Sequence, residues 1–149
     1  MRRLYFNQKG IGLVEVIAAL GISVVVITSL LSLTLFSLRT SLQSTVMMEA
    51  TKAANQQMEL LRAYRDTVDW NTFLGVTNCT GNCHLSSNLI FNTSAPAIVY
   101  SGGTTITVGI TATSDASDVV HAKVTASWNI GGQNKSTYVY TDFTNWQGK

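Results

Sequence analysis

The chain has 149 residues, of which 46% are hydrophobic and 12% are charged, and its formal net charge is +2. This length fits one domain, or one domain with an appendage, and such high hydrophobicity with so little charge excludes intrinsic disorder. Arg2, Arg3 and Lys9 lie in the first ten positions, so residues 11–149 contain seven basic and eight acidic side chains. Because that remainder has no excess of positive charge to hold a phosphate backbone, we expect no nucleic-acid partner.

A long apolar segment follows the basic N-terminus. Residues 11–38 contain one charged side chain, Glu15, and the residues from 16 to 38 contain none. About 20 apolar residues in a helix cross a bilayer, whereas the apolar region of a cleaved secretory signal has roughly 7–15. We therefore expect one transmembrane helix rather than a soluble enzyme. Since only Arg39 follows it closely, the N-terminus should stay cytoplasmic and the rest of the chain should be exported.

Glu15 lies four residues into the apolar run, and by itself it has two explanations. An acid at the centre of a membrane helix costs about 2.5–3.5 kcal/mol, and less near an interface. The carboxylate can therefore reach water near the lipid headgroups, or it can pair with a positive charge inside an assembly. The residue alone does not decide between the two.

The residues around Glu15, Lys9-Gly10-Ile11-Gly12-Leu13-Val14-Glu15-Val16, resemble the processing motif of type IV prepilins. In that family a short basic leader ends in Gly, an apolar residue follows, and Glu is fifth in the mature chain. Gly10, Ile11 and Glu15 match these positions, although the family usually has Phe where Ile11 stands. The resemblance is close over about residues 8–40.

Several expectations follow from this resemblance. It implies that residues 1–10 are a leader, which a prepilin peptidase removes after Gly10 before methylating the amine of Ile11. It also implies that Glu15 takes part in assembly, that other pilin subunits and an inner-membrane assembly machinery are partners, and that residues 11–38 form the transmembrane and assembly helix.

Residues 39–66 predict an amphipathic continuation of that helix. They contain no Pro or Gly, and apolar residues recur at helical spacing. We expect the apolar stripe, which includes Met47 and Met58, to form the seam between the helix and a sheet rather than a ligand groove. A helix from Ile11 to about Tyr64 would be about 80 Å long at 1.5 Å per residue.

Residues 67–149 predict a loop region followed by the sheet of a globular domain. Turn-forming residues dominate as far as Pro96, and alternating apolar residues then predict three antiparallel strands, at 106–112, 120–130 and 136–143. The expected fold class is α+β: a long N-terminal α-helix, transmembrane and then amphipathic, packed on a small antiparallel β-sheet.

Cys79 and Cys83 are the two cysteines of the chain. Both lie in the part expected to be exported, where oxidising conditions favour a disulfide between them. The ring is small, so the chain-entropy estimate is about 2 kcal/mol. Free thiols are a weaker alternative. A metal site would add His84, which gives three ligands at most, so we expect neither a metal nor a cofactor.

No catalytic site is apparent, and we predict that the protein is not an enzyme. His84 lies in the loop region and His121 on the wet face of a predicted strand, where both fit solvated surface side chains. Asp115 and Asp118 would suit a calcium ion, but turn formation explains them more simply. Three aromatic residues fit either an exposed binding stripe or cross-strand packing: Tyr138, Tyr140 and Trp146.

The expected function is a structural subunit of a type IV pilus or a related filament. Residues 56–62 and 140–146 are similar to minor pilins of the PilV type. Two alternatives stay open: a pseudopilin of a type II secretion or DNA-uptake system, and a signal-anchored extracytoplasmic binding module. The expected location is the cytoplasmic membrane, crossed once, and then an extracellular or periplasmic filament.

Overall fold

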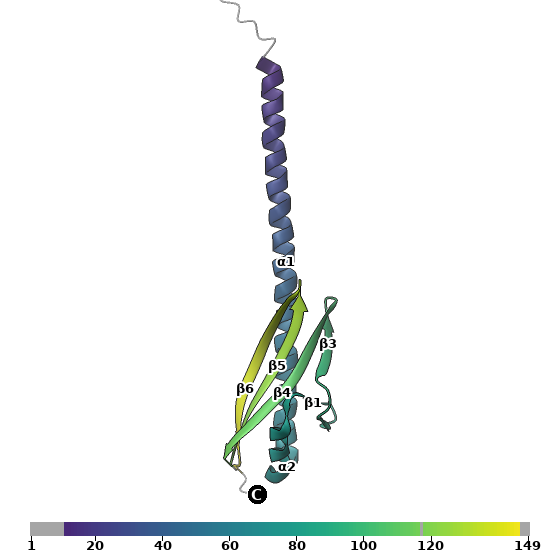
Figure 1. The fold of residues 1–149 in the computed structure, drawn as a ribbon, viewed down its shortest axis with the longest axis vertical. Helices are drawn as coiled ribbons and strands as arrows, with labels where there is room; N and C mark the ends of the chain where they lie inside the picture. The colour runs from purple at the N-terminus through teal and green to yellow at the C-terminus, as the bar shows by residue number, and fades with distance from the viewer. Residues whose placement is uncertain (1–10, 117, 147–149) are drawn as a thin grey trace, which may run out of the picture. The chain divides into compact units, whose positions relative to one another are not determined.

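A computed structural model describes the backbone of residues 11–116 and 118–146 (Figure 1). The chain divides after Ser41 into two compact units. In the described residues, one long helix precedes a short helix, a 3-10 turn and a six-stranded sheet. The architecture is α+β, with the long helix packed on a small antiparallel sheet, as the sequence predicts.

Helix α1 runs from Ile11 to Thr67, a length of 57 residues. No proline interrupts it, and several of its Ser and Thr hydroxyls donate to carbonyl oxygens one turn earlier in the helix. The Ser29 hydroxyl donates to the carbonyl of Val25 at 2.7 Å, and the Thr34 hydroxyl donates to the carbonyl of Leu30 at 2.8 Å. Such bonds let hydroxyl groups lie in an apolar helix without needing water.

In the second unit, the later part of α1 packs on the sheet through one buried stripe. Its members are spaced three or four residues apart, as one helical face requires. They are Val46, Ala50, Ala53, Ala54, Met58 and Leu61. Met58 thus lies in the predicted seam between helix and sheet. Met47 does not: helical spacing places it on the same side as Ala50 and Ala54, but its side chain is 54% exposed.

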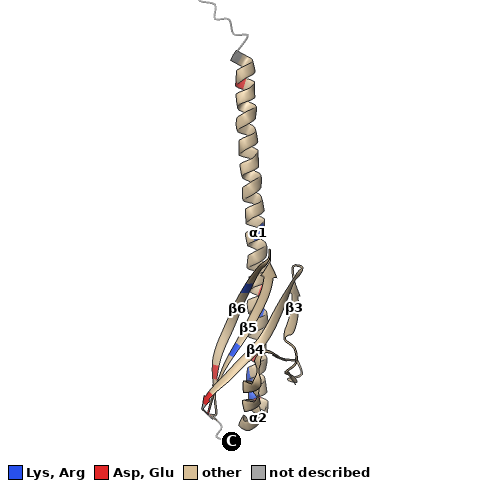
Figure 2. Cartoon of the chain, viewed as in Figure 1, with Lys and Arg blue, Asp and Glu red and all other residues tan. Residues whose placement is uncertain are grey.

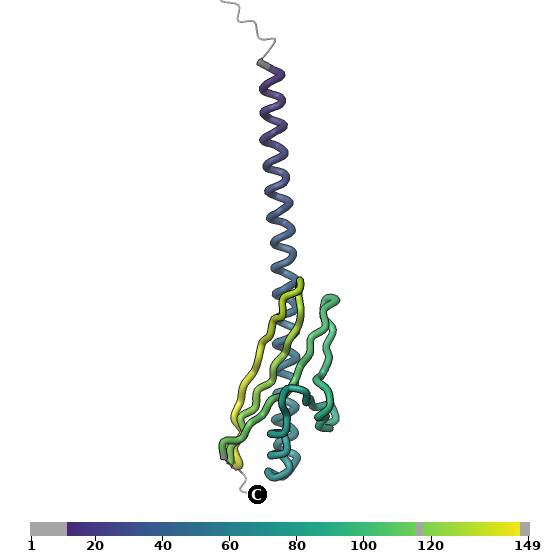
Figure 3. Tube along the Cα trace, in the orientation of Figure 1, coloured from purple at the N-terminus to yellow at the C-terminus, as the bar shows by residue number. Residues whose placement is uncertain are grey.

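The three predicted strands are present and are longer than expected. Strands β4 (Thr104–Ala116), β5 (Val119–Ile130) and β6 (Gln133–Thr144) form an antiparallel meander (Figure 3). Ile110 pairs with Val124, which pairs with Val139, so apolar residues align on the face toward α1. The alternate residues form the outer face of the sheet.

The expectation of only three strands and an irregular segment up to Pro96 was wrong. Helix α2 (Trp70–Leu74) and the 3-10 turn η1 (Gly75–Asn78) lead into β1 (Thr80–Leu85), β2 (Phe91–Asn92) and β3 (Ala97–Ser101). Strands β1 and β3 both pair with β4, and β2 pairs with β1. All three are short. In β1, which contains Gly81 and Asn82, pairing with β4 rather than local propensity makes the strand, whereas β3 contains the strand-favouring residues Ile98, Val99 and Tyr100.

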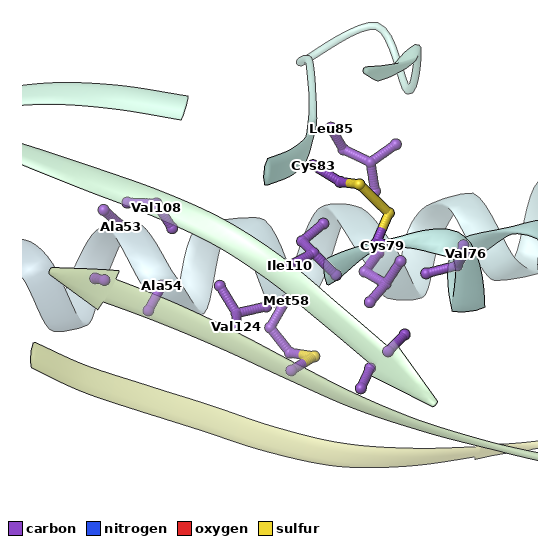
Figure 4. Packing of buried hydrophobic residues seen from close by; sticks show 14 of the residues in the cluster. Ala53, Ala54, Met58, Val76, Cys79, Cys83, Leu85, Val108, Ile110 and Val124 are labelled. Carbon is purple, nitrogen blue, oxygen red and sulfur yellow. A yellow bond between two sulfur atoms is a disulfide. The ribbon is translucent and has the colours of Figure 1, made fainter. Parts of the chain in front are cut away.

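One hydrophobic core joins the second half of α1, the inner face of the sheet and η1. Figure 4 shows Met58 and Ala54 of α1 close to Val124 of β5, with Ile110 of β4 beside the cysteine pair. At the end of the helix, the Phe73 ring meets the Phe143 ring edge-on with centroids 5.1 Å apart. This core holds the outer face of the sheet in a fixed geometry.

Candidate functional site

The first half of α1 has no apolar partner within the described part of the chain. Its large hydrophobic side chains, from Leu13 to Leu38, are between 50% and 72% exposed. Moving one such side chain out of water stabilises by about 1.5–3 kcal/mol, so this surface favours lipid or protein surroundings strongly. The helix is long and apolar enough to cross a membrane, consistent with a single-pass membrane protein.

Glu15 is the one acidic or basic residue in that apolar surface. Residues 16–38, which follow it, contain no charged side chain, and the early part of α1 is accordingly tan over most of its length in Figure 2. The helix begins at Ile11, so Glu15 lies four residues, or about one turn, from the first helical residue. Gly10 and the side chain of Ile11 lie outside the described residues, and processing between these two residues stays a prediction.

Cys79 and Cys83 form a disulfide, with their Cα atoms 5.7 Å apart. Cys79 ends η1 and Cys83 lies in β1, and both are buried in the core beside Leu85 and Ile110 (Figure 4). The disulfide is therefore part of the hydrophobic core and does not close a turn at the surface. Both sulfurs are engaged in this bond, which removes them as metal ligands.

The disulfide loop crosses β4 at a glycine. Gly81, within the loop, has φ +105°, a conformation that favours glycine. The carbonyl group of Gly81 lies against Gly109 of β4. A Cβ atom added at Gly109 would collide with the carbonyl oxygen and would lie 2.8 Å from the carbonyl carbon. Register shifts between Thr80 and Cys83 at this point, so the loop is a bulge seated on a position without a side chain.

A cluster of hydrogen-bonding side chains lies on the outer face of the sheet, where the sequence suggested only a solvated histidine. The Nδ1 atom of His121 is 2.7 Å from Oδ1 of Asp142, and its Nε2 atom is 3.0 Å from Oδ2 of Asp115. The Tyr140 hydroxyl is 3.0 Å from the same Nδ1 atom. Asp115, His121 and Tyr140, together with Lys123, line a shallow hollow of about 350 Å³.

The charges of this cluster shift its titration. The Asp142 carboxylate, which accepts a hydrogen bond from His121, raises the pKa of His121 above its ordinary value, and Asp115 adds to the rise. The His121 and Tyr140 hydrogen bonds lower the pKa of Asp142. The same carboxylate raises the pKa of the Tyr140 hydroxyl. In each case the cause is a hydrogen bond or a charge that favours one protonation state.

The two-residue turn at Gly131-Gly132 is the sequence feature from which part of this cluster could have been predicted. It pairs Ile130 with Gln133, and antiparallel pairing then places His121 opposite Asp142. Asp115 could not be placed in the same way, because the register of β4 shifts between Ser114 and Ala116.

The remaining candidates have structural roles. The Nδ1 atom of His84 is 2.7 Å from the carbonyl oxygen of Ala95. The Asp115 carboxylate contacts His121, and the backbone carbonyl of Asp118 accepts a hydrogen bond from Asn145. Within residues 11–116 and 118–146, no group of three or more His, Cys, Asp or Glu side chains is arranged to hold a metal ion.

The exposed aromatic residues of the C-terminal segment contact cations. The Lys123 ammonium lies 4.6 Å from the centre of the Tyr138 ring. The guanidinium of the buried Arg65 lies 5.0 Å from the centre of the Trp146 ring and donates to the carbonyl oxygen of Thr144 at 2.8 Å. Trp146 thus covers the buried end of α1, while the Tyr140 ring stacks on His121. These contacts give the aromatic residues packing roles within the domain, and a binding role for their exposed surfaces stays a prediction.

A groove of about 1120 Å³ lies in the second unit between α1 and the edge strand β3. Met47, Met48 and Leu60 of α1 line it, together with Ala97 and Val99 of β3. Met47, which was expected in the seam between helix and sheet, thus lines this groove instead.

Comparisons with protein-family models, curated proteins and solved structures found no match. The functional argument therefore rests on the residues of this chain and their geometry. Two features are unexplained by folding alone: the exposed apolar half of α1 with Glu15 in it, and the cluster around His121.

Proposed function

We propose that this chain is a type IV pilin-like structural subunit, a minor pilin, which is processed after Gly10 and assembles into a filament through α1. The observation that supports this most is Glu15, a single carboxylate one turn into an exposed apolar helix. Exposed apolar area supplies the driving force for packing helices together, and the carboxylate restricts how they pack.

The proposed role of Glu15 follows from the cost of burying a charge. A carboxylate enclosed by apolar helices without a partner is strongly destabilising, so the assembled state has to supply a positive charge. Cleavage before Ile11 would create an α-amine about one helical turn from Glu15, and methylation would leave that amine protonatable. Their attraction in apolar surroundings is much stronger than in water.

A pair formed across two subunits would define the axial position of each incoming helix. Apolar packing alone is non-directional, and helices with uniformly apolar surfaces can slide along one another. A single charge pair allows one register, because any other leaves two charges unpaired. We favour this intermolecular pair over one within a single helix.

The second unit fits an exported domain. Its disulfide is typical of an oxidising compartment, and its own core holds it together without the first half of α1. The proposed partners are a prepilin peptidase, other pilin subunits, the inner-membrane assembly machinery and the membrane itself. The proposed location is the cytoplasmic membrane, with the N-terminus cytoplasmic, followed by an extracellular or periplasmic filament.

Processing is tested on protein recovered from cells that contain a prepilin peptidase. The intact mass should show the loss of residues 1–10 and the gain of one methyl group, with Ile11 as the first residue. Recovery of the chain with Met1 still in place would support the alternative of a signal-anchored binding module.

Assembly is tested with Glu15→Gln and Glu15→Val. Both variants should insert and be cleaved like the wild type, but the ratio of protein in sheared filaments to protein in membranes should fall. Glu59→Gln is the matched control, because Glu59 lies on α1 of the second unit in an exposed pair with Arg62. Unchanged incorporation of both Glu15 variants would overturn the proposed role of this carboxylate.

A further inference from the structure

His121 bridges the two strands that flank its own. It is the third residue of β5, Asp115 is next to last in β4, and Asp142 is third from last in β6. Both imidazole nitrogens are used, with Nδ1 2.7 Å from Asp142 and Nε2 3.0 Å from Asp115. One side chain therefore connects the ends of three strands on the outer face of the sheet.

The two contacts require a particular protonation state. A carboxylate can only accept hydrogen bonds, and a neutral imidazole has one N–H to donate. The imidazolium has two, so contacts to two carboxylates are both hydrogen bonds only when the ring is protonated. In the neutral ring, one of the two nitrogens would face a carboxylate with a lone pair.

We propose that His121 is a proton-dependent clamp that ties the end of β4 to β6 through Asp115 and Asp142, and that loss of its proton releases Asp115. This inference concerns the second unit alone and does not depend on the proposed function.

The geometry indicates which contact is lost. The Asp142 contact is shorter, and the side chain of Asp142 is 49% exposed against 82% for Asp115. The Tyr140 hydroxyl lies 3.0 Å from Nδ1, and its ring stacks on the imidazole, so the Nδ1 side of His121 is held by β6. The neutral ring therefore keeps its proton on Nδ1, and the exposed Asp115 turns to water.

The charged and titratable groups that surround the ring are few. Asp115 faces it from β4, Asp142 and Tyr140 face it from β6, and Lys123 lines the same hollow from β5. With His121 protonated, two carboxylates balance two cations. Deprotonation leaves one excess negative charge, so the clamp also changes the net charge of this part of the sheet's outer face.

The pH range follows from the directions of the two shifts. The pKa of His121 is raised from 6.5, so its contribution to stability is complete below 6.5 and is lost as pH rises through the raised value. The pKa of Asp142 is lowered from 3.8, so its contribution is complete above 3.8 and is lost as pH falls through the lowered value. The combined contribution of His121 and Asp142 should thus be largest between pH 3.8 and 6.5.

The test is an NMR pH titration of the full chain in detergent micelles, with His84→Gln as the background so that His121 is the one histidine. The His121 midpoint should lie above 6.5, and the carboxyl carbon of Asp115 should shift with the same midpoint. Above that midpoint, the ring nitrogen signals should show the proton on Nδ1. A midpoint at or below 6.5, or a neutral ring protonated on Nε2, would overturn the clamp.

Three variants separate the two carboxylates. Asp142→Asn should lower the His121 midpoint most, since this residue is the largest cause of the raised pKa. Asp115→Asn should lower it less. Asp118→Asn is the control, because it removes a carboxylate from the adjacent turn and should leave the midpoint unchanged. If Asp118→Asn lowered the midpoint as much as Asp142→Asn, general charge rather than the clamp would explain the titration.

Discussion

The two halves of α1 share one backbone and differ in what their apolar side chains meet. Between Leu13 and Leu38 the large apolar side chains are exposed within the described structure, whereas between Val46 and Leu61 a narrow stripe is buried under the sheet. Both halves are equally helical. Helical structure by itself therefore does not decide burial, which depends on whether a partner is present.

This difference separates the chain's stability from its proposed function. The second half stabilises the globular unit, since removing any member of its buried stripe leaves a cavity. The members of that core begin at Val46, and the large apolar side chains of the first half are exposed. Changes in the two halves should then have different consequences.

The test with the largest expected effect replaces one leucine by alanine in each half of α1. Leu61→Ala should lower the free energy of unfolding by about 2–5 kcal/mol, because Leu61 is fully buried and its loss creates a cavity. Leu31→Ala should change the free energy of unfolding by less than about 0.5 kcal/mol, because the Leu31 side chain is exposed and lies outside the core. Denaturation in detergent, followed by the fluorescence of the buried Trp70 and Trp128, measures both. Equal losses would show that the first half also stabilises the globular unit.

A second pair uses glycines. Gly109→Ala should destabilise the globular unit by about 3 kcal/mol, since the added Cβ collides with the Gly81 carbonyl and backbone has to move. Gly21→Ala meets nothing within 4 Å and lies inside a helix, where alanine is favoured. The same denaturation experiment should therefore show a loss for Gly109→Ala alone. A Gly109→Ala protein as stable as the wild type would mean that the disulfide loop does not lie against β4.

The smallest expected effect concerns the disulfide. Replacing Cys79 and Cys83 together by alanine should lower the unfolding free energy by about 2 kcal/mol, since the closed ring is short, and the domain should still fold. Alkylation of the protein unfolded without reductant should label neither cysteine. Complete labelling of both would contradict the bond.

Long periodic segments were predictable because many residues indicate the same structure. The apolar run from Ile11 extends over more than twenty residues, and the strand centred on Val124 alternates over about ten, so single exceptions do not obscure them. Strands β1 and β3 were missed for the opposite reason. Each is five or six residues long, and β1 contains Gly81 and Asn82, which favour turns.

The sequence by itself determined the elements whose cause is local: an apolar helix long enough for a membrane with one carboxylate near its start, an amphipathic continuation, three alternating strands and a closely spaced cysteine pair. Tertiary structure decided what depends on distant residues meeting. The Gly81 carbonyl lies against Gly109 where the register of β1 shifts. Asp115 contacts His121 where the register of β4 shifts. A register shift of one residue reverses the face of every later side chain, and only the packed sheet specifies where such a shift occurs.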